Sequence, residues 1–275
     1  MIKKILIPAA AAAAITAAGL PNGRIDVTYY EIGSPKLKAK LRLVILADLH
    51  DEDYGKQMEQ LTEKIIPLNP DMIMIPGDLC EEKKNDEHSM CLLNRLKAYP
   101  VFYSTGNHEE HRPDLPDLLS KIRAAGAHVP ETEAECIEMK GNELEILSLP
   151  CLKEEYDYIP EDVNRRFHTD RYRMMLSHRP SWIDLYNSTE CDLILSGHAH
   201  GGQWRIPALH RGLIAPSAGF FPKYTEGVHE LNGKKMVISR GLTKKTHGVI
   251  RLYNNPEIVV LDLIPEVNNA EETAA

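Results

Sequence analysis

Apolar residues in this chain occur in short, nearly continuous runs, and most of these runs end at a polar residue or a glycine. Such runs are typical of strands that are buried on both faces of a sheet. They predict strands at 41–47, 72–75, 101–104, 172–176 and 192–196. A short motif that follows a run of this kind is therefore expected at the end of a strand.

Between several of these runs, apolar residues recur at the spacing of one helix face. The pattern predicts helices at 54–66, 89–98 and 114–125. Gly141 and Asn142 separate two runs at 136–139 and 144–149 and predict a β-hairpin. Further strands are predicted at 25–32, 228–231, 235–239, 248–252 and 257–263. Strands that alternate with helices indicate an α/β fold.

The two ends of the chain differ from its middle. Lys3 and Lys4 precede an apolar run from Ile5 to Leu20, a pattern typical of a signal peptide or a membrane anchor. We therefore predict a leader or anchor at 1–22, one folded domain at 23–265 and a disordered acidic tail at 266–275. The anchor would make the protein membrane-associated. Basic residues on both sides of the run leave open which face of the membrane it occupies.

Composition narrows the possible partners. The formal net charge is -8, with 40 acidic residues against 32 Lys and Arg, so we expect no nucleic-acid partner. The five cysteines form no C-x-x-C pair, which argues against a disulfide framework and against a thiolate zinc site. No pattern in the sequence predicts a protein partner.

Five separated segments carry residues that can bind a metal ion. Each lies at or just after the end of a predicted strand, where α/β sheets bind their ligands. The segments are Asp48-Leu49-His50, Gly77-Asp78, Gly106-Asn107-His108-Glu109, His178 and Gly197-His198-Ala199-His200. Taken singly, each is more typical of a turn or a surface histidine. Taken together, carboxylate, imidazole and carboxamide ligands without a thiolate suit manganese, iron or zinc.

In order and spacing, these segments resemble the signature of the calcineurin-like metallophosphoesterases, from about Leu41 to Leu263. The resemblance implies an α/β fold of one type, a four-layer αββα sandwich with two mixed β-sheets. It also implies two divalent metal ions (Mn, Fe or Zn) as cofactors. A hydroxide that bridges the two ions would attack the phosphorus atom of a phosphoester in line.

The resemblance assigns a role to each matching residue. One metal ion would be held by Asp48, His50, Asp78 and His200, and the other by Asp78, Asn107, His178 and His198. His108 would be the catalytic residue that stabilises or protonates the leaving oxygen. Glu109 would orient its neighbours rather than bind metal.

Segments nearer the C-terminus resemble a membrane-associated bacterial branch of the family, which includes phosphodiesterases similar to UDP-2,3-diacylglucosamine pyrophosphatases. They include Ser196–Gln203, Gly219–Tyr224, Ser239–Leu242 and Asn255–Ile258. Arg205, Arg240 and Lys223 are candidates to bind a substrate phosphate, and salt bridges are an equally good alternative for them. The stretch 243–247 lacks the proline that is usual in this branch.

The function predicted from sequence is hydrolysis of phosphodiester or pyrophosphate bonds, with a lipid-linked or nucleotide-sugar substrate as the finer hypothesis. Three alternatives remain open: a phosphomonoesterase or protein phosphatase of the same fold, a non-catalytic scaffold that has kept its metal ligands, and a metal-storing or sensing module.

Overall fold

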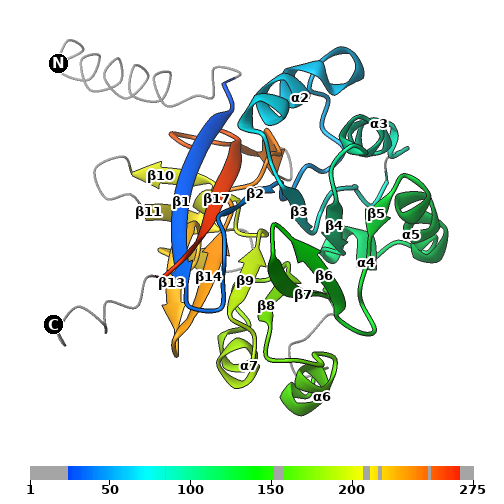
Figure 1. Ribbon diagram of the computed structural model, residues 1–275. Coiled ribbons are helices and arrows are strands. Elements are labelled where there is room, and N and C mark those ends of the chain that lie inside the picture. Colours follow the sequence, from blue (N-terminus) through cyan, green and yellow to red (C-terminus); the bar gives the residue numbers. More distant parts are fainter. Residues whose placement is uncertain are drawn as a thin grey trace, which may run out of the picture.

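Two six-stranded mixed sheets form the centre of the structure, a computed structural model that describes residues 24–83, 85–151, 158–206, 211–215, 219–246 and 249–266 (Figure 1). The first sheet has the order β1-β17-β2-β3-β4-β5. Its strands are β1 (Asp26–Ser34), β17 (Glu257–Pro265), β2 (Leu41–Ile45), β3 (Met72–Pro76), β4 (Val101–Ser104) and β5 (Ala127–His128). Only the pairing of β17 with β2 is antiparallel.

The second sheet has the order β13-β14-β9-β8-β7-β6. Its strands are β13 (Gly227–Leu231), β14 (Lys234–Ile238), β9 (Leu193–Ser196), β8 (Tyr172–Ser177), β7 (Asn142–Leu149) and β6 (Glu135–Met139). The four inner strands are parallel, and hairpins add an antiparallel strand at each edge. The predicted hairpin at 136–149 is the β6–β7 edge.

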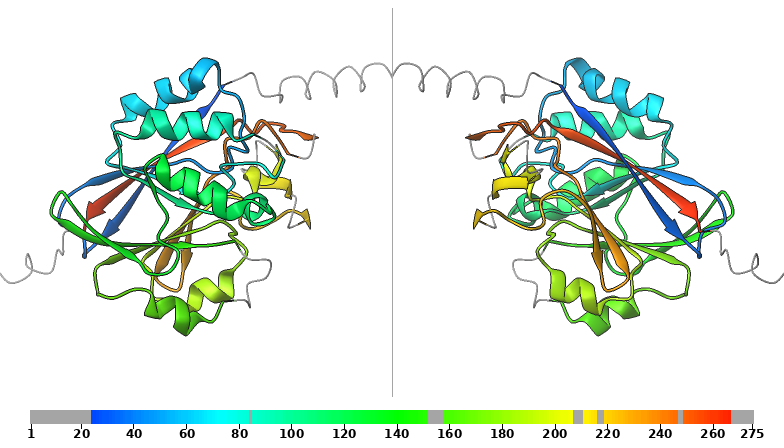
Figure 2. Two further views of the ribbon diagram at one scale, coloured as in Figure 1. Left: turned by 90° about the vertical axis from the view of Figure 1, so that its right-hand side faces the viewer. Right: turned by 90° about the vertical axis from the view of Figure 1, so that its left-hand side faces the viewer.

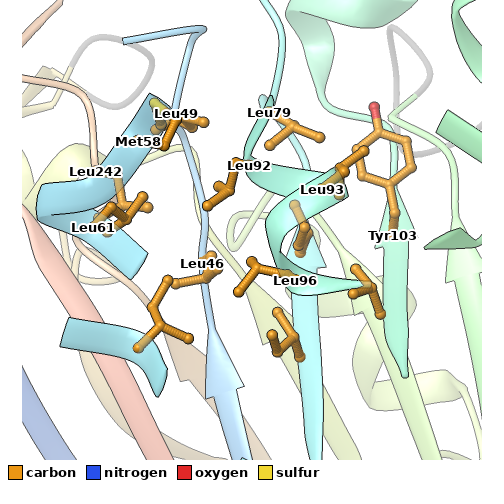
Figure 3. Close-up of a cluster of buried hydrophobic side chains, with 14 of the residues drawn as sticks. Leu46, Leu49, Met58, Leu61, Leu79, Leu92, Leu93, Leu96, Tyr103 and Leu242 are labelled. Carbon is orange, nitrogen blue, oxygen red and sulfur yellow. The ribbon is translucent and has the colours of Figure 1, made fainter. Parts of the chain in front are cut away.

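Helices cover the outer face of each sheet, which gives four layers (Figure 2). Beside the first sheet are α2 (Glu59–Ile65), α3 (Glu87–Leu96) and α5 (Leu115–Ala124), and beside the second are α6 (Pro160–Arg165) and α7 (Ile183–Ser188). The short helix α4 (Asn107–Glu110) instead follows β4 at the edge of the first sheet. Leu61 of α2 and Leu92 and Leu96 of α3 pack with Leu46 in the core beside the first sheet (Figure 3). The apolar residues of α6 and α7 pack on the second sheet in the same way.

A third core lies between the two sheets and explains why the inner strands are apolar on both faces. Leu43, Met74 and Phe102 of the first sheet and Met174 and Leu195 of the second belong to this core and are at most 1% exposed. All five residues of β3 are buried. The predicted αββα sandwich with two mixed sheets is therefore confirmed.

Smaller elements lie at one side of the sandwich, and of these only β16 (Val249–Ile250) falls within a predicted strand. They are β10 (Trp204–Ile206), β11 (Arg211–Ala215) and β12 (Gly219–Phe220), which form a three-stranded sheet, and the pair β15 (Lys245–Thr246) and β16. The single strand predicted at 248–252 is thus part of a short antiparallel pair. Single-turn 3₁₀ helices occur at Lys56–Met58, Ile66–Leu68 and His200–Gly202.

The prediction of membrane association is wrong for the part of the chain that the structure describes. No helix there combines the length and the apolar composition that are needed to cross a bilayer. Helices α3 and α5 have 10 residues each, about half of the ~20 that a span requires. The leader or anchor predicted at 1–22 and the tail predicted at 266–275 lie outside the described residues, apart from Glu266.

Candidate metal centre

The five predicted ligand segments meet at one edge of the sandwich because each follows the carboxyl end of a parallel strand. Segments from the first sheet follow β2, β3 and β4, and segments from the second follow β8 and β9. The loops continue to pair beyond the strands. The His50 N–H donates to the Asp78 carbonyl at 2.9 Å, and the Gly197 N–H donates to the His178 carbonyl at 3.1 Å. The backbone thus fixes how the segments lie relative to one another.

Six of the seven candidate ligands form two adjacent clusters, in each of which the ligand atoms lie within 4.8 Å of one another. The clusters are Asp48, His50 and His200, and Asp78, His178 and His198. His50 Nε2 lies 3.6 Å from Asp78 Oδ2, so the two clusters adjoin. Within the second cluster, His178 Nε2 lies 3.0 Å from Asp78 Oδ2 and 3.2 Å from His198 Nδ1. The position of Asp78 between the clusters is the one expected of a bridging carboxylate.

Asn107, the seventh candidate, begins α4 at the same edge. The neighbouring His108 N–H donates to Asp78 Oδ1 at 3.0 Å, which ties this helix to the Asp78 loop. Asn107 Oδ1, His198 Nε2 and His200 Nδ1 are buried with no hydrogen-bond partner among the described residues. Buried polar atoms without a partner are rare. Their concentration on the predicted ligands, and their oxygen and nitrogen chemistry, fit a site for divalent metal ions.

The backbone at the site is strained in a way that the sequence did not reveal. Asp48, His50, Asp78, His198 and His200 all have φ between +47° and +66°, a region that residues other than glycine seldom occupy. Each such residue costs about 1–3 kcal/mol and persists only where its surroundings hold it. The ligand side chains are therefore positioned by the fold before any metal binds.

Two glycines allow the backbone to approach Asp48 closely. A Cβ atom on Gly241, whose φ is +75°, would lie 2.5 Å from Asp48 Oδ2, and one on Gly197 would lie 2.8 Å from the same oxygen. The His198 N–H donates to this carboxylate at 2.9 Å. Asp48 is held between the β9 loop and the loop after β14, which packs the two sheets together at the site.

The hydrogen bonds of Glu109 suit its predicted orienting role, which stays a prediction. Its buried carboxylate accepts hydrogen bonds from the backbone N–H groups of Asp78 (3.1 Å), Cys80 (2.8 Å) and Gly106 (2.8 Å). These groups belong to the loops after β3 and β4. One side chain therefore fixes both loops, and with them the Asp78 and Asn107 side chains.

Glu81 is a site residue that the sequence analysis missed. Its carboxylate forms a short hydrogen bond with His108 Nδ1 and lies 3.3 Å from His50 Nδ1. The buried Arg112 supports this loop, because it donates to the Glu81 carbonyl at 3.1 Å and pairs with both oxygens of Asp86. The only signal in the sequence was an acidic residue three positions after Asp78, which does not reveal where the side chain points.

The pKa values at the site follow from burial and from these charges. Burial lowers the pKa of His198 to about 3, and it holds the pKa of His200 well below the usual value. Both imidazoles are neutral at pH 7, as metal binding requires. Burial opposes charge on Asp78, yet His178 and His50 hold the pKa of this carboxyl well below its usual range. For His108, burial is outweighed by Glu81 and Asp78, and the pKa rises to about 9.

The two arginines predicted to bind substrate are both engaged in ion pairs. Arg205 forms a close ion pair with Glu226. Arg240 lies 3.0 Å from Glu257 and 3.4 Å from Asp26, at the start of β17 and β1. Their role in substrate binding stays a prediction, and the ion pairs are the alternative that we also expected.

Residues 41–202 match the family described as calcineurin-like phosphoesterase. The chain belongs to this family. The match spans the strands and loops that present all seven candidate ligands. Membership confirms the family resemblance and agrees with the predicted class of phosphoester hydrolase.

Several curated relatives of this phosphoesterase are bacterial. An uncharacterized metallophosphoesterase of Campylobacter jejuni is 30% identical over 86% of this chain, which spans 63% of that relative's length. The uncharacterized metallophosphoesterase YkuE of Bacillus subtilis is 29% identical over 94% of this chain and 95% of its own length. The phosphodiesterase YaeI of Escherichia coli is 26% identical over 82% of this chain and 83% of its own length.

Proposed function

We propose that the protein is a dinuclear metal-dependent phosphohydrolase that cleaves phosphodiester or pyrophosphate bonds. One metal ion would be held by Asp48, His50, Asp78 and His200, and the other by Asp78, Asn107, His178 and His198. The observation that carries the proposal is the pair of adjoining clusters. Asn107, His198 and His200 each have a buried oxygen or nitrogen atom with no hydrogen-bond partner among the described residues. These atoms face a cost of about 1–3 kcal/mol each unless a ligand satisfies them.

The hydrogen bonds around the clusters support the same assignment. His178 Nδ1 lies 2.9 Å from the Pro76 carbonyl, to which it can donate, and this leaves Nε2 directed at Asp78. A metal-binding histidine usually donates its other ring N–H to a carbonyl or carboxylate in this way. When bound, two divalent ions stabilise charge on the phosphoryl oxygens and lower the pKa of water.

His108 is the proposed general acid. Glu81 binds Nδ1 of His108 and thereby fixes the orientation of the ring, so Nε2 is the nitrogen that would deliver a proton to the leaving oxygen. The His108 side chain is 13% exposed, and its backbone N–H is fixed by Asp78. A positioned acid of this kind contributes about 10²–10⁴-fold to a rate.

The preference for diesters over monoesters has two supports. The E. coli relative is named a phosphodiesterase, and the C-terminal segments resemble a branch that includes pyrophosphatases. A lipid-linked or nucleotide-sugar pyrophosphate is the finer form of this proposal. Equal turnover of p-nitrophenyl phosphate and bis-p-nitrophenyl phosphate would instead favour a phosphomonoesterase.

The test is turnover of bis-p-nitrophenyl phosphate by protein reconstituted with manganese. Asp78→Asn should abolish turnover and lower the bound metal, because it weakens the bridging ligand. His108→Ala should lower kcat by about 10²–10⁴-fold while the bound metal is retained. Asp117→Asn, an exposed carboxylate on α5, is the matched control. Unchanged turnover in Asp78→Asn would refute the proposal, and stoichiometric metal without turnover would support a scaffold or a metal store.

A further inference from the structure

A small pocket lies beside the second cluster and shares His198 with it. Its volume is about 80 Å³, and it is lined by Pro180, Ser181, His198, Ala199, Pro222, Lys223 and Tyr224. One buried water needs a volume of about 10–15 Å³, so the pocket has room for a polar group of several atoms. Because His198 is in its wall, a substrate held at the second cluster could extend directly into it.

Lys223 lines this pocket, and Arg179 directly precedes the wall residue Pro180 in the chain. Neither forms an ion pair with any residue that the structure describes. Lys223 Nζ lies 4.8 Å from the ring centroid of its neighbour Tyr224. Arg179, between His178 and the pocket residue Pro180, donates from Nε to Cys151 Sγ at 3.1 Å. Both differ from Arg205 and Arg240, whose charges are neutralised by carboxylates.

Arg179 follows His178 of the second cluster directly in the chain. Lys223 is exposed and Arg179 is partly exposed, so neither side chain has to be uncovered before a ligand binds. Cations in such a position favour an anionic ligand and discriminate against a neutral one.

We propose that this pocket is a subsite for a second anionic group of the substrate, held by Lys223 and Arg179. The proposal rests on the proposed function, because it places the scissile phosphate at the two clusters. It adds that the substrate carries a further phosphate or carboxylate beyond the scissile bond.

Two inhibitors that differ by one carboxylate test this proposal. Methylphosphonate offers only the group that binds at the metal clusters, whereas phosphonoacetate adds a carboxylate two bonds from phosphorus. We expect phosphonoacetate to inhibit bis-p-nitrophenyl phosphate turnover at least about tenfold more tightly, because a hydrogen bond to a charged group is worth that much or more. Lys223→Ala and Arg179→Gln should each reduce the ratio of the two inhibition constants by about five- to tenfold.

Lys97→Ala is the matched control, because Lys97 is exposed at the end of α3. It should keep the parent ratio. Chelation of free metal by either inhibitor acts equally on every variant, so it cancels in the comparison. The subsite proposal is overturned if the two inhibition constants are nearly equal in the parent protein. It is also overturned if neither Lys223→Ala nor Arg179→Gln changes their ratio.

Calorimetric binding of the two phosphonates separates this proposal from the proposed function. If the reconstituted protein does not hydrolyse the diester, the proposed function fails, and the ratio of the two dissociation constants still tests the subsite. If hydrolysis is present and the ratio is insensitive to both substitutions, only the subsite fails.

Discussion

Replacement of Glu109 tests the idea that one buried carboxylate holds both metal-ligand loops. Glu109→Ala removes the acceptor for three buried backbone N–H groups, those of Asp78, Cys80 and Gly106. At about 1–3 kcal/mol for each unsatisfied donor, the free energy of unfolding should fall by roughly 3–9 kcal/mol. Glu109→Gln can keep the oxygen that accepts from Asp78 and Gly106, so it should lose only about 1–3 kcal/mol.

The assay is urea-induced unfolding at pH 8 with metal removed by a chelator. Burial and Asp78 raise the pKa of Glu109 to about 7, so at pH 8 the carboxylate is charged and accepts all three bonds. Glu63→Gln, exposed on α2, is the control and should stay within about 0.5 kcal/mol of the parent. The metal concentration that half-saturates activity should also rise about 10–100-fold in Glu109→Gln. An unfolding free energy of Glu109→Ala within about 1 kcal/mol of the parent would refute the reasoning.

Three further predictions concern the frame of the site. Gly241→Ala should destabilise the protein by about 2–4 kcal/mol in urea unfolding, because its Cβ would lie 2.5 Å from Asp48 at a left-handed φ; an unchanged midpoint would contradict this. The hydrogen bond from Arg42, with Lys40 nearby, lowers the pKa of Asp262. The ionised Asp262 carboxylate therefore stabilises the folded protein fully above about pH 4, and this stabilisation is lost as the pH falls through the lowered pKa. Unfolding curves of Asp262→Asn and the parent should therefore converge at low pH, and a constant gap would argue against the pairing. Metal at 100 times its Kd should stabilise the folded protein by about 2.7 kcal/mol. A chelator should remove this stabilisation, which lowers the melting temperature, and it should abolish turnover.

The sequence predicted the inner strands well because burial on both faces makes them continuous apolar runs. The predicted strands at 72–75 and 101–104 agree with β3 and β4 to within one residue. Candidate ligands could be identified for the same reason, since each motif follows such a run. The order of strands could not be predicted, because β1 and β17 pair in parallel across more than 200 residues.

The parts of the site that were missed depend on loop geometry. Glu81 contacts His108 from the loop after β3, and Arg112 and Asp86 help to hold that loop in place. The left-handed φ values of the ligands arise from tertiary packing, and no local residue pattern encodes them. Arg205 and Arg240 have the charge that a phosphate requires, but their neighbours in space, Glu226 and Glu257, are distant in sequence.

The position of β17 in the first sheet has a consequence for synthesis of the protein on the ribosome. β17 lies between β1 and β2, so a nascent chain that has not yet reached residues 257–265 leaves an unpaired edge on each of these strands. β2 leads to Asp48, and Glu257 at the start of β17 binds Thr28 of β1 and Arg240. The candidate metal centre is therefore expected to form late in folding, because a chain that stalls before residue 257 carries all seven candidate ligands but lacks β17.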